Sequence, residues 1–144
     1  MTHFTFATAG QIRFGRGIAR DCVAELAALA PRVLLVTGAN SARADWLRGA
    51  LTGAGCTVTI FAALREPDLD MITDAVTRAR QADVGAVIAL GGGAAIDTGK
   101  AIAALIPATR PALDHLEVVG LGLPLDHPPC PSPPCQPHRG RAPR

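Results

Sequence analysis

Residues 84–101 read VGAVIALGGGAAIDTGKA. The run Val84–Leu90 is apolar on both faces, as expected of a central parallel strand that helices cover on each side. Gly91-Gly92-Gly93 ends this strand. The Ala-rich stretch from Ala94 to Ile106 then predicts a helix, which Pro107 stops. A buried strand that turns through three glycines into a helix is typical of an α/β fold.

The segments before residue 84 alternate in the same way between strand-like and helix-like periodicity. The predicted strands are two short ones within Phe4–Phe14, one at Val33–Val36 and one at Thr57–Phe61. A first helix ends before Pro31, and its apolar face consists of Ile18, Cys22, Leu26 and Leu29. A second helix covers about 42–54, with Ser41 as its N-cap and with Trp46, Leu47, Ala50 and Leu51 inward; a third starts at Asp68, and its apolar face consists of Leu69, Ile72, Val76 and Ala79. This alternation predicts a Rossmann-like, doubly wound parallel sheet over residues 1–123.

The composition narrows the class of protein. With 49% hydrophobic residues in 144, the chain can form one core, and its apolar runs are far shorter than the roughly 20 residues that cross a bilayer. No secretory signal is visible at the N-terminus, so we expect a cytoplasmic protein with reduced cysteines. The net charge of +2 comes from the last 21 residues, because residues 1–123 hold 11 basic and 11 acidic side chains. That balance and the 3% aromatic content argue against nucleic-acid binding.

The three glycines suggest a phosphate site. Glycine lets the backbone approach a ligand closely, and the N-terminus of the following helix offers free N–H groups and a positive dipole end. The alternative is that the glycines only make a tight turn between strand and helix, and glycines alone leave these two interpretations about equal. The spacing is neither GxGxxG nor GxxxxGK[ST], so the two common nucleotide-binding motifs are not present here.

The string GGGAAIDTGKA resembles the GGGSxxDxxKA signature of iron-type alcohol dehydrogenases, and the resemblance extends over about residues 4–125. Residues 12–17 (IRFGRG) are similar to an early FGxG turn of that family, Val33–Gly38 to its first nucleotide-domain strand, and Glu66-Pro67 to the loop after its second strand. Ala94 replaces the more usual Ser. The fold that this implies is the N-terminal domain shared with dehydroquinate synthase.

The resemblance implies a set of cofactor-binding residues. Gly91, Gly92, Gly93 and Ala94 would form the turn whose backbone N–H groups line the pyrophosphate of a nicotinamide dinucleotide. Asp97 would face the nicotinamide ribose or shape the cleft, its alternative role being a first-turn carboxylate that the helix dipole favours.

Two further positions bear on the cofactor. Lys100 would approach the cofactor or a carboxylate, or else be a surface charge. Gly38 stands where some relatives have an Asp that binds the adenosine ribose hydroxyls. Such a carboxylate would repel a 2′-phosphate, so its absence allows NADP as well as NAD.

The activity implied by the resemblance is hydride transfer between a small alcohol or aldehyde and NAD or NADP, with iron or another divalent metal polarising the substrate oxygen. The metal site that the resemblance implies consists of one Asp and three His from a helical C-terminal domain, which this sequence does not contain. We therefore assign no catalytic residue and no metal ligand, and expect the apolar surface left by that domain to lower solubility. A homo-oligomer is compatible with the family.

Three alternatives stay open at this point. A maleylacetate reductase-like enzyme would share the fold and work without metal. A dehydroquinate synthase-like enzyme would use NAD transiently, although residues 97–100 (DTGK) favour the dehydrogenase branch. A non-catalytic nucleotide-binding remnant is the third.

Residues 124–144 differ in character, since they hold eight of the twelve prolines and three arginines. Pro128–Pro134 predicts no packed element, so we expect a disordered tail. The family continues at this point with a strand and a PTTxGTGSE-like loop. Reading the third base of each codon from Pro128 with the first two of the next permits the residues PLPIAAVPTTSGTGS, which contain that loop. The tail is thus expected to be a frameshift product.

Sequencing the gene through codon 128 and several hundred bases beyond tests the frameshift. We expect the alternative frame to continue into a helical region with closely spaced histidines. A confirmed present frame with no family-like sequence in the alternative frame would contradict it.

Overall fold

A computed structural model describes residue 13 and residues 15–135, which form a parallel sheet between two layers of helices. The strands are β1 (Arg32–Gly38), β2 (Thr57–Ala63), β3 (Ala86–Leu90) and β4 (Pro134–Cys135), in the order β2-β1-β3-β4. All three pairings are parallel. The predicted α/β class is confirmed, and the three predicted strands that lie within the described residues are present.

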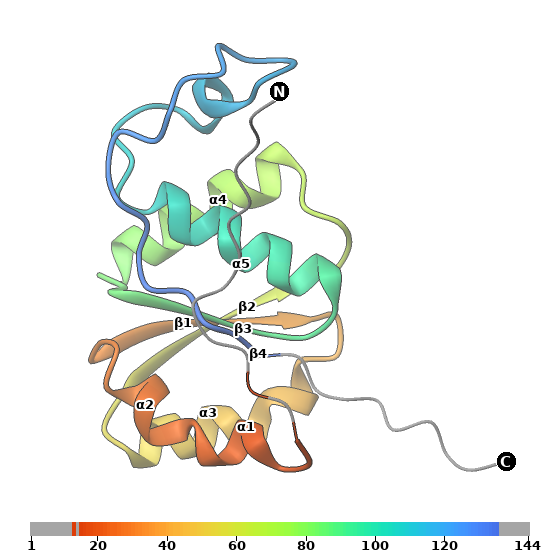
Figure 1. Ribbon diagram of the computed structural model, residues 1–144, viewed down its shortest axis with the longest axis vertical. Coiled ribbons are helices and arrows are strands. Elements are labelled where there is room, and N and C mark those ends of the chain that lie inside the picture. Colours follow the sequence, from red (N-terminus) through yellow and green to blue (C-terminus); the bar gives the residue numbers. More distant parts are fainter. Residues whose placement is uncertain (1–12, 14, 136–144) are drawn as a thin grey trace, which may run out of the picture.

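Helices cover both faces of the sheet (Figure 1). On one face lie α4 (Leu69–Gln81) and α5 (Gly93–Leu105). On the other lie α1 (Ile18–Asp21), α2 (Val23–Ala27) and α3 (Asp45–Gly53). Two short 3-10 helices, η1 (Ser41–Ala44) and η2 (Ala112–His115), complete the described part. None of the helices in that part is long and apolar enough to cross a membrane.

The strand periodicity of two divides the interior into two cores. Leu34 and Val36 of β1 pack in the cluster under α4 and α5, whereas Val33 and Leu35 pack in the cluster under α2 and α3. All five residues of β3 are buried. Each fully buried Leu or Ile contributes roughly 1.5–3 kcal/mol, so burial on both faces makes β1 and β3 the main source of stability.

The helices α4 and α5 differ in how the N–H groups of their first turn are capped. Asp68 caps α4 as predicted, because its carboxylate accepts a hydrogen bond of 2.8 Å from the backbone N–H of Met71. This hydrogen bond has the largest effect in holding the pKa of Asp68 below its usual value, and the hydrogen bond from the Arg65 guanidinium has the next largest. The start of α5 has no side-chain cap.

Two predictions about the early helices are wrong in detail. The single helix expected from Ile18 to Leu29 is broken at Cys22 into α1 and α2, and Leu29 is 36% exposed rather than packed. Ser41 does not cap α3, since it begins η1 and α3 starts only at Asp45. The tighter 3-10 turn consumes one turn of chain before the α-helix begins. The strands predicted within Phe4–Phe14 lie outside the described residues.

The prediction that no packed element forms from the Pro-rich stretch is also wrong. The Cys130 N–H donates to the Ala103 carbonyl at 2.9 Å, and the Val87 N–H donates to the Pro131 carbonyl at 2.9 Å. Pro134–Cys135 then forms β4 beside Ala89 and Leu90. Proline lacks an N–H but keeps its carbonyl, so an edge position suits it. The limit between residues 123 and 124 stays a prediction.

Between α5 and this edge, residues 107–126 form a loop beyond the helical layer (Figure 1). Its apolar side chains are largely exposed, with Val118 at 95%, Val119 at 71% and Leu121 at 69%. The loop is closed by Asp126, whose carboxylate accepts hydrogen bonds from the Thr109 hydroxyl and from the Thr109 N–H, the latter at 3.0 Å. These hydrogen bonds lower the pKa of Asp126 to about 2, and the bond from the Thr109 hydroxyl has the largest effect.

Replacing Thr109 by Val should raise the pKa of Asp126 toward its ordinary 3.8, because the strongest donor to the carboxylate is lost. In the wild type the folded-state pKa lies below the unfolded value, so this carboxylate stabilises the loop fully above pH 3.8 and stops doing so as the pH falls through about 2. An NMR titration of the Asp126 carboxyl carbon measures the shift. Thr109→Ser, which keeps the hydroxyl, is the control, and an unchanged titration in Thr109→Val would contradict the assignment.

Candidate functional site

The order of the strands places one crevice at the carboxyl edge of the sheet. The chain passes from β1 to β2 on one side and then crosses over to β3 on the other side of β1. The register pairs Thr37 with Leu90, so the ends of β1 and β3 lie side by side. In open α/β sheets, ligands bind where the strand order reverses in this way.

A cavity of about 660 Å³ lies at this point. Its walls come from the ends of β1 and β3, from η1, and from α1 and α3 in the helical layer that does not contain α5. The lining residues are Ala19, Thr37, Gly38, Ala39, Asn40, Arg43, Ala44, Trp46, Leu90, Gly91 and Gly92. Of the described residues in this lining, Arg43 is the one that carries a charge, so the cavity suits an anionic or polar ligand.

Gly91 is required by the close approach of the two strand ends. A Cβ at residue 91 would lie 2.7 Å from the Cβ of Ala95 and 3.3 Å from the backbone N of Gly38. Only a residue without a side chain therefore lets the chain turn from β3 into α5 so close to β1. Gly99 plays the matching part further along, since its added Cβ would lie 2.8 Å from the Cβ of Ala89 on β3.

The N-terminus of α5 presents free backbone donors. Gly92 precedes the helix in an extended conformation, and no side chain caps the N–H groups that follow it. Gly92 and Gly93 are exposed and Ala94 is half-buried, and space around the two glycines is open within 4 Å. Backbone N–H groups and the helix dipole at such a terminus attract phosphate.

The structure brings some of the predicted residues together and separates others. Gly38, Gly91 and Gly92 share the cavity lining. Asp97 and Lys100 are both exposed and lie 3.5 Å apart as an ion pair on the outer face of α5. Neither lines the cavity, and the cofactor contacts expected of them stay predictions.

Several lining residues were not predicted from the sequence as part of the site. Asn40 and Arg43 follow β1 in the turn and in η1, and Trp46 on α3 is half-buried against the core with the Arg20 guanidinium 4.9 Å from its ring centre. Sequence periodicity marked Trp46 only as an inward position. Asn40 and Arg43 follow β1, but the sequence does not show that β1 lies beside β3, so their place near the glycine turn follows from the strand order.

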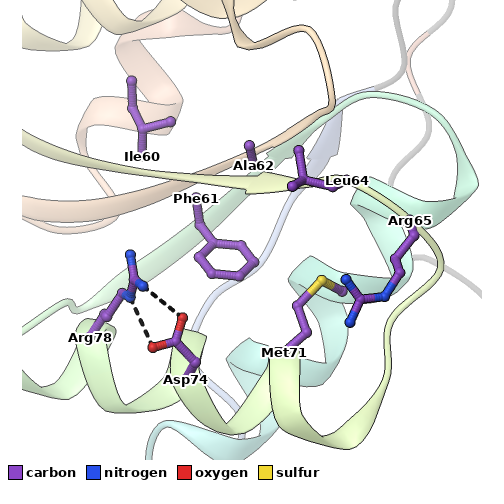
Figure 2. Close-up of a pocket in the computed structure, with 8 residues that line it drawn as sticks. All are labelled: Ile60, Phe61, Ala62, Leu64, Arg65, Met71, Asp74 and Arg78. Atoms are coloured by element: carbon purple, nitrogen blue, oxygen red, sulfur yellow. Dashed lines mark hydrogen bonds and ion pairs between the residues drawn. The ribbon is translucent and has the colours of Figure 1, made fainter.

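A second hollow, of about 330 Å³, lies at the free edge of β2, where the Phe61 ring points toward α4 residues (Figure 2). Its charged side chains are already paired, Arg78 with Asp74 at 2.9 Å and Arg65 with Asp68. Exposed ion pairs of this kind contribute little and leave no free charge for a ligand. The crevice between β1 and β3 is therefore the better candidate.

No cluster of three or more histidine, cysteine, aspartate or glutamate side chains suited to a metal ion occurs in residues 13 and 15–135. His115 is half-buried, with its Nδ1 3.1 Å from the Leu123 carbonyl, and His127 is exposed on the loop. These positions do not fit a metal site, so no metal chemistry is assigned to the described residues.

Comparison with known proteins agrees with this geometry. A family model described as iron-containing alcohol dehydrogenase matches residues 9–132. The chain belongs to the iron-containing alcohol dehydrogenase family. The match covers strands β1 to β3, the glycine turn and the loop through Asp126. No curated protein matches the chain significantly.

Solved structures of this dehydrogenase family share the fold. The sulfoacetaldehyde reductase from Bifidobacterium kashiwanohense, in complex with NAD⁺, aligns with a TM-score of 0.73 and 25% identity over 92% of this chain and 35% of that chain. The NADH-dependent butanol dehydrogenase A from Thermotoga maritima gives 0.65 and 26% over 78% and 30%. An iron-containing alcohol dehydrogenase from the same organism gives 0.61 and 29% over 67% and 29%. The chain thus spans about a third of the length of these dehydrogenases and matches their Rossmann-like domain.

Gly91→Ala should lower the free energy of unfolding by about 1–3 kcal/mol, because the new methyl group meets Ala95 and the Gly38 backbone. Urea denaturation followed by circular dichroism measures the change. Gly38→Ala, at the end of the neighbouring strand, is the matched control, since nothing lies within 4 Å of its added Cβ. Equal stability of the two variants would show that the strand ends are not closely packed at Gly91.

Proposed function

We propose that this chain binds a nicotinamide dinucleotide, NAD or NADP, across the carboxyl ends of β1 and β3. The observation that carries the proposal is the glycine turn, where Gly91 admits no side chain and the uncapped N-terminus of α5 opens on the same crevice. The NAD⁺ complex of the sulfoacetaldehyde reductase, which shares this fold, supports it.

In this proposal each part of the crevice has a separate task. The backbone N–H groups at Gly93 and Ala94 donate hydrogen bonds to the pyrophosphate, and the dipole of the 13-residue α5 stabilises its negative charge. The adenosine half lies toward Gly38, at the end of β1. Ala94 contributes its backbone N–H as a Ser would, so the missing hydroxyl removes a single side-chain contact.

We further propose that the whole enzyme transfers hydride between a small alcohol or aldehyde and the nicotinamide, which accepts or donates that hydride when bound. The names of the solved relatives, two dehydrogenases and a reductase, favour hydride transfer over a dehydroquinate synthase-like lyase reaction. A maleylacetate reductase-like reaction, a purely nucleotide-binding role, metal dependence, a cytoplasmic location and a homo-oligomer stay predictions for the whole protein.

The chain of 144 residues should bind dinucleotide weakly and show no dehydrogenase turnover, because its described residues form the nucleotide side of the crevice only. Isothermal titration calorimetry with NAD⁺ and NADP⁺ measures binding, and absorbance at the reduced nicotinamide band measures turnover. Alcohol oxidation by the pure chain would contradict the expected inactivity.

Gly93→Asp makes the binding test specific. The open space around residue 93 accepts a side chain, and a carboxylate in the first turn stabilises a helix, so the variant should fold as well as the wild type. The same carboxylate repels the pyrophosphate, so dinucleotide affinity should fall at least about tenfold. Gly93→Asn adds the same bulk without charge. Equal affinity of the Asp and Asn variants would place the pyrophosphate elsewhere.

A further inference from the structure

We propose that Arg43 binds the 2′-phosphate of the adenosine ribose and makes the crevice prefer NADP over NAD. This inference rests on the proposed dinucleotide site and adds a specificity-determining residue to it. It is drawn from the charge of the cavity, the place of Arg43 within it and the open space at Gly38.

The charge of the cavity is the first argument. Among the described residues that line the cavity, Arg43 is the one that carries a charge, and it is exposed. No ion pair or side-chain hydrogen bond is formed by Arg43 with any residue in the described part of the chain. Arg48, on the following helix, is by contrast paired with Asp45 at 3.3 Å and lies outside the lining. A guanidinium that has no partner among the described residues and belongs to a residue of the cavity wall can bind phosphate oxygens strongly, because its donors match them in geometry.

The place of Arg43 within the cavity separates it from the pyrophosphate site. Gly91 and Gly92 belong to the β3 side, where α5 begins. Arg43 belongs to the β1 side, in η1, where its backbone N–H bonds the Asn40 carbonyl at 3.4 Å. A dinucleotide with its pyrophosphate at α5 therefore has its adenosine ribose, and any phosphate on that ribose, next to Gly38 and Arg43.

The open space at Gly38 removes the usual discrimination against a 2′-phosphate. A carboxylate at the end of this strand would accept hydrogen bonds from the ribose hydroxyls and repel a phosphate. Gly38 has no side chain, and nothing lies within 4 Å of the position its Cβ would take. The 2′-phosphate thus finds room, a cation and no opposing negative charge in the lining.

The test is a comparison of affinities for NADP⁺ and NAD⁺ in the 144-residue chain, by calorimetry at low ionic strength. Quenching of Trp46, the sole tryptophan of the chain and a lining residue, gives an independent signal. The wild type should bind NADP⁺ about tenfold more tightly than NAD⁺. Arg43→Ala should remove most of that difference by lowering NADP⁺ affinity far more than NAD⁺ affinity, and the matched control Arg48→Ala should retain it.

The outcomes separate the two proposals. Equal weakening of NAD⁺ and NADP⁺ by Arg43→Ala would mean that Arg43 contacts the shared pyrophosphate, which overturns this inference but keeps the dinucleotide site. Equal wild-type affinity for the two cofactors would overturn it as well. Absence of binding by either cofactor would instead overturn the proposed function.

A second variant tests the inference by adding a negative charge to the crevice. Gly38→Asp should invert the preference, because the new carboxylate pairs with Arg43 and repels the 2′-phosphate. Gly38→Asn, of the same size but neutral, should keep NADP⁺ as the tighter ligand. The same preference in the Asp and Asn variants would contradict the inference.

Discussion

The parallel pairing of β1 with β3 is the constraint on which the rest of the structure depends. It buries both strands between two helical layers, and it brings their carboxyl ends to one edge of the sheet. The turn after β3 must then pass within contact distance of the backbone of Gly38. Stability and site geometry therefore share one cause, since the packing that orders the sheet also forces the glycine that opens the crevice.

The sequence predicted the elements that bury side chains most completely. Val84–Leu90 is apolar on both faces because helices cover both, and the structure has β3 there with all its residues buried. Asp68 was predictable because its cap is local, needing a donor only three residues away. The break at Cys22 and the 3-10 turn at Ser41 were not predictable from periodicity. Both place apolar residues at nearly the same helical spacing as an unbroken helix would.

Part of the candidate site could be predicted from the sequence and part could not. Three adjacent glycines between a strand and a helix mark a turn at the end of the strand, so Gly91 and Gly92 could be predicted from the sequence, and both lie in the cavity lining. Arg43 and Asn40 carry no such signal, because a charged or polar residue in a surface turn is common. Their significance depends on which strands are neighbours, and strand order is a tertiary property. The pairing of Asp97 with Lys100 likewise depends on which face of α5 meets solvent.

The short edge formed by Pro134–Cys135 has a consequence for sequence tolerance. The segment that leads to it is held by backbone hydrogen bonds, in which the Pro131 carbonyl accepts from Val87 and the Cys130 N–H donates to Ala103, and Cys130 also packs against the core. Main-chain groups are the same in every residue except for the N–H that proline lacks. These hydrogen bonds therefore depend on the path of the backbone rather than on the identity of the side chains, which is why a proline-rich segment can form them. Position 91 of the glycine turn, by contrast, accepts no side chain, because an added Cβ would meet Ala95 and the backbone of Gly38.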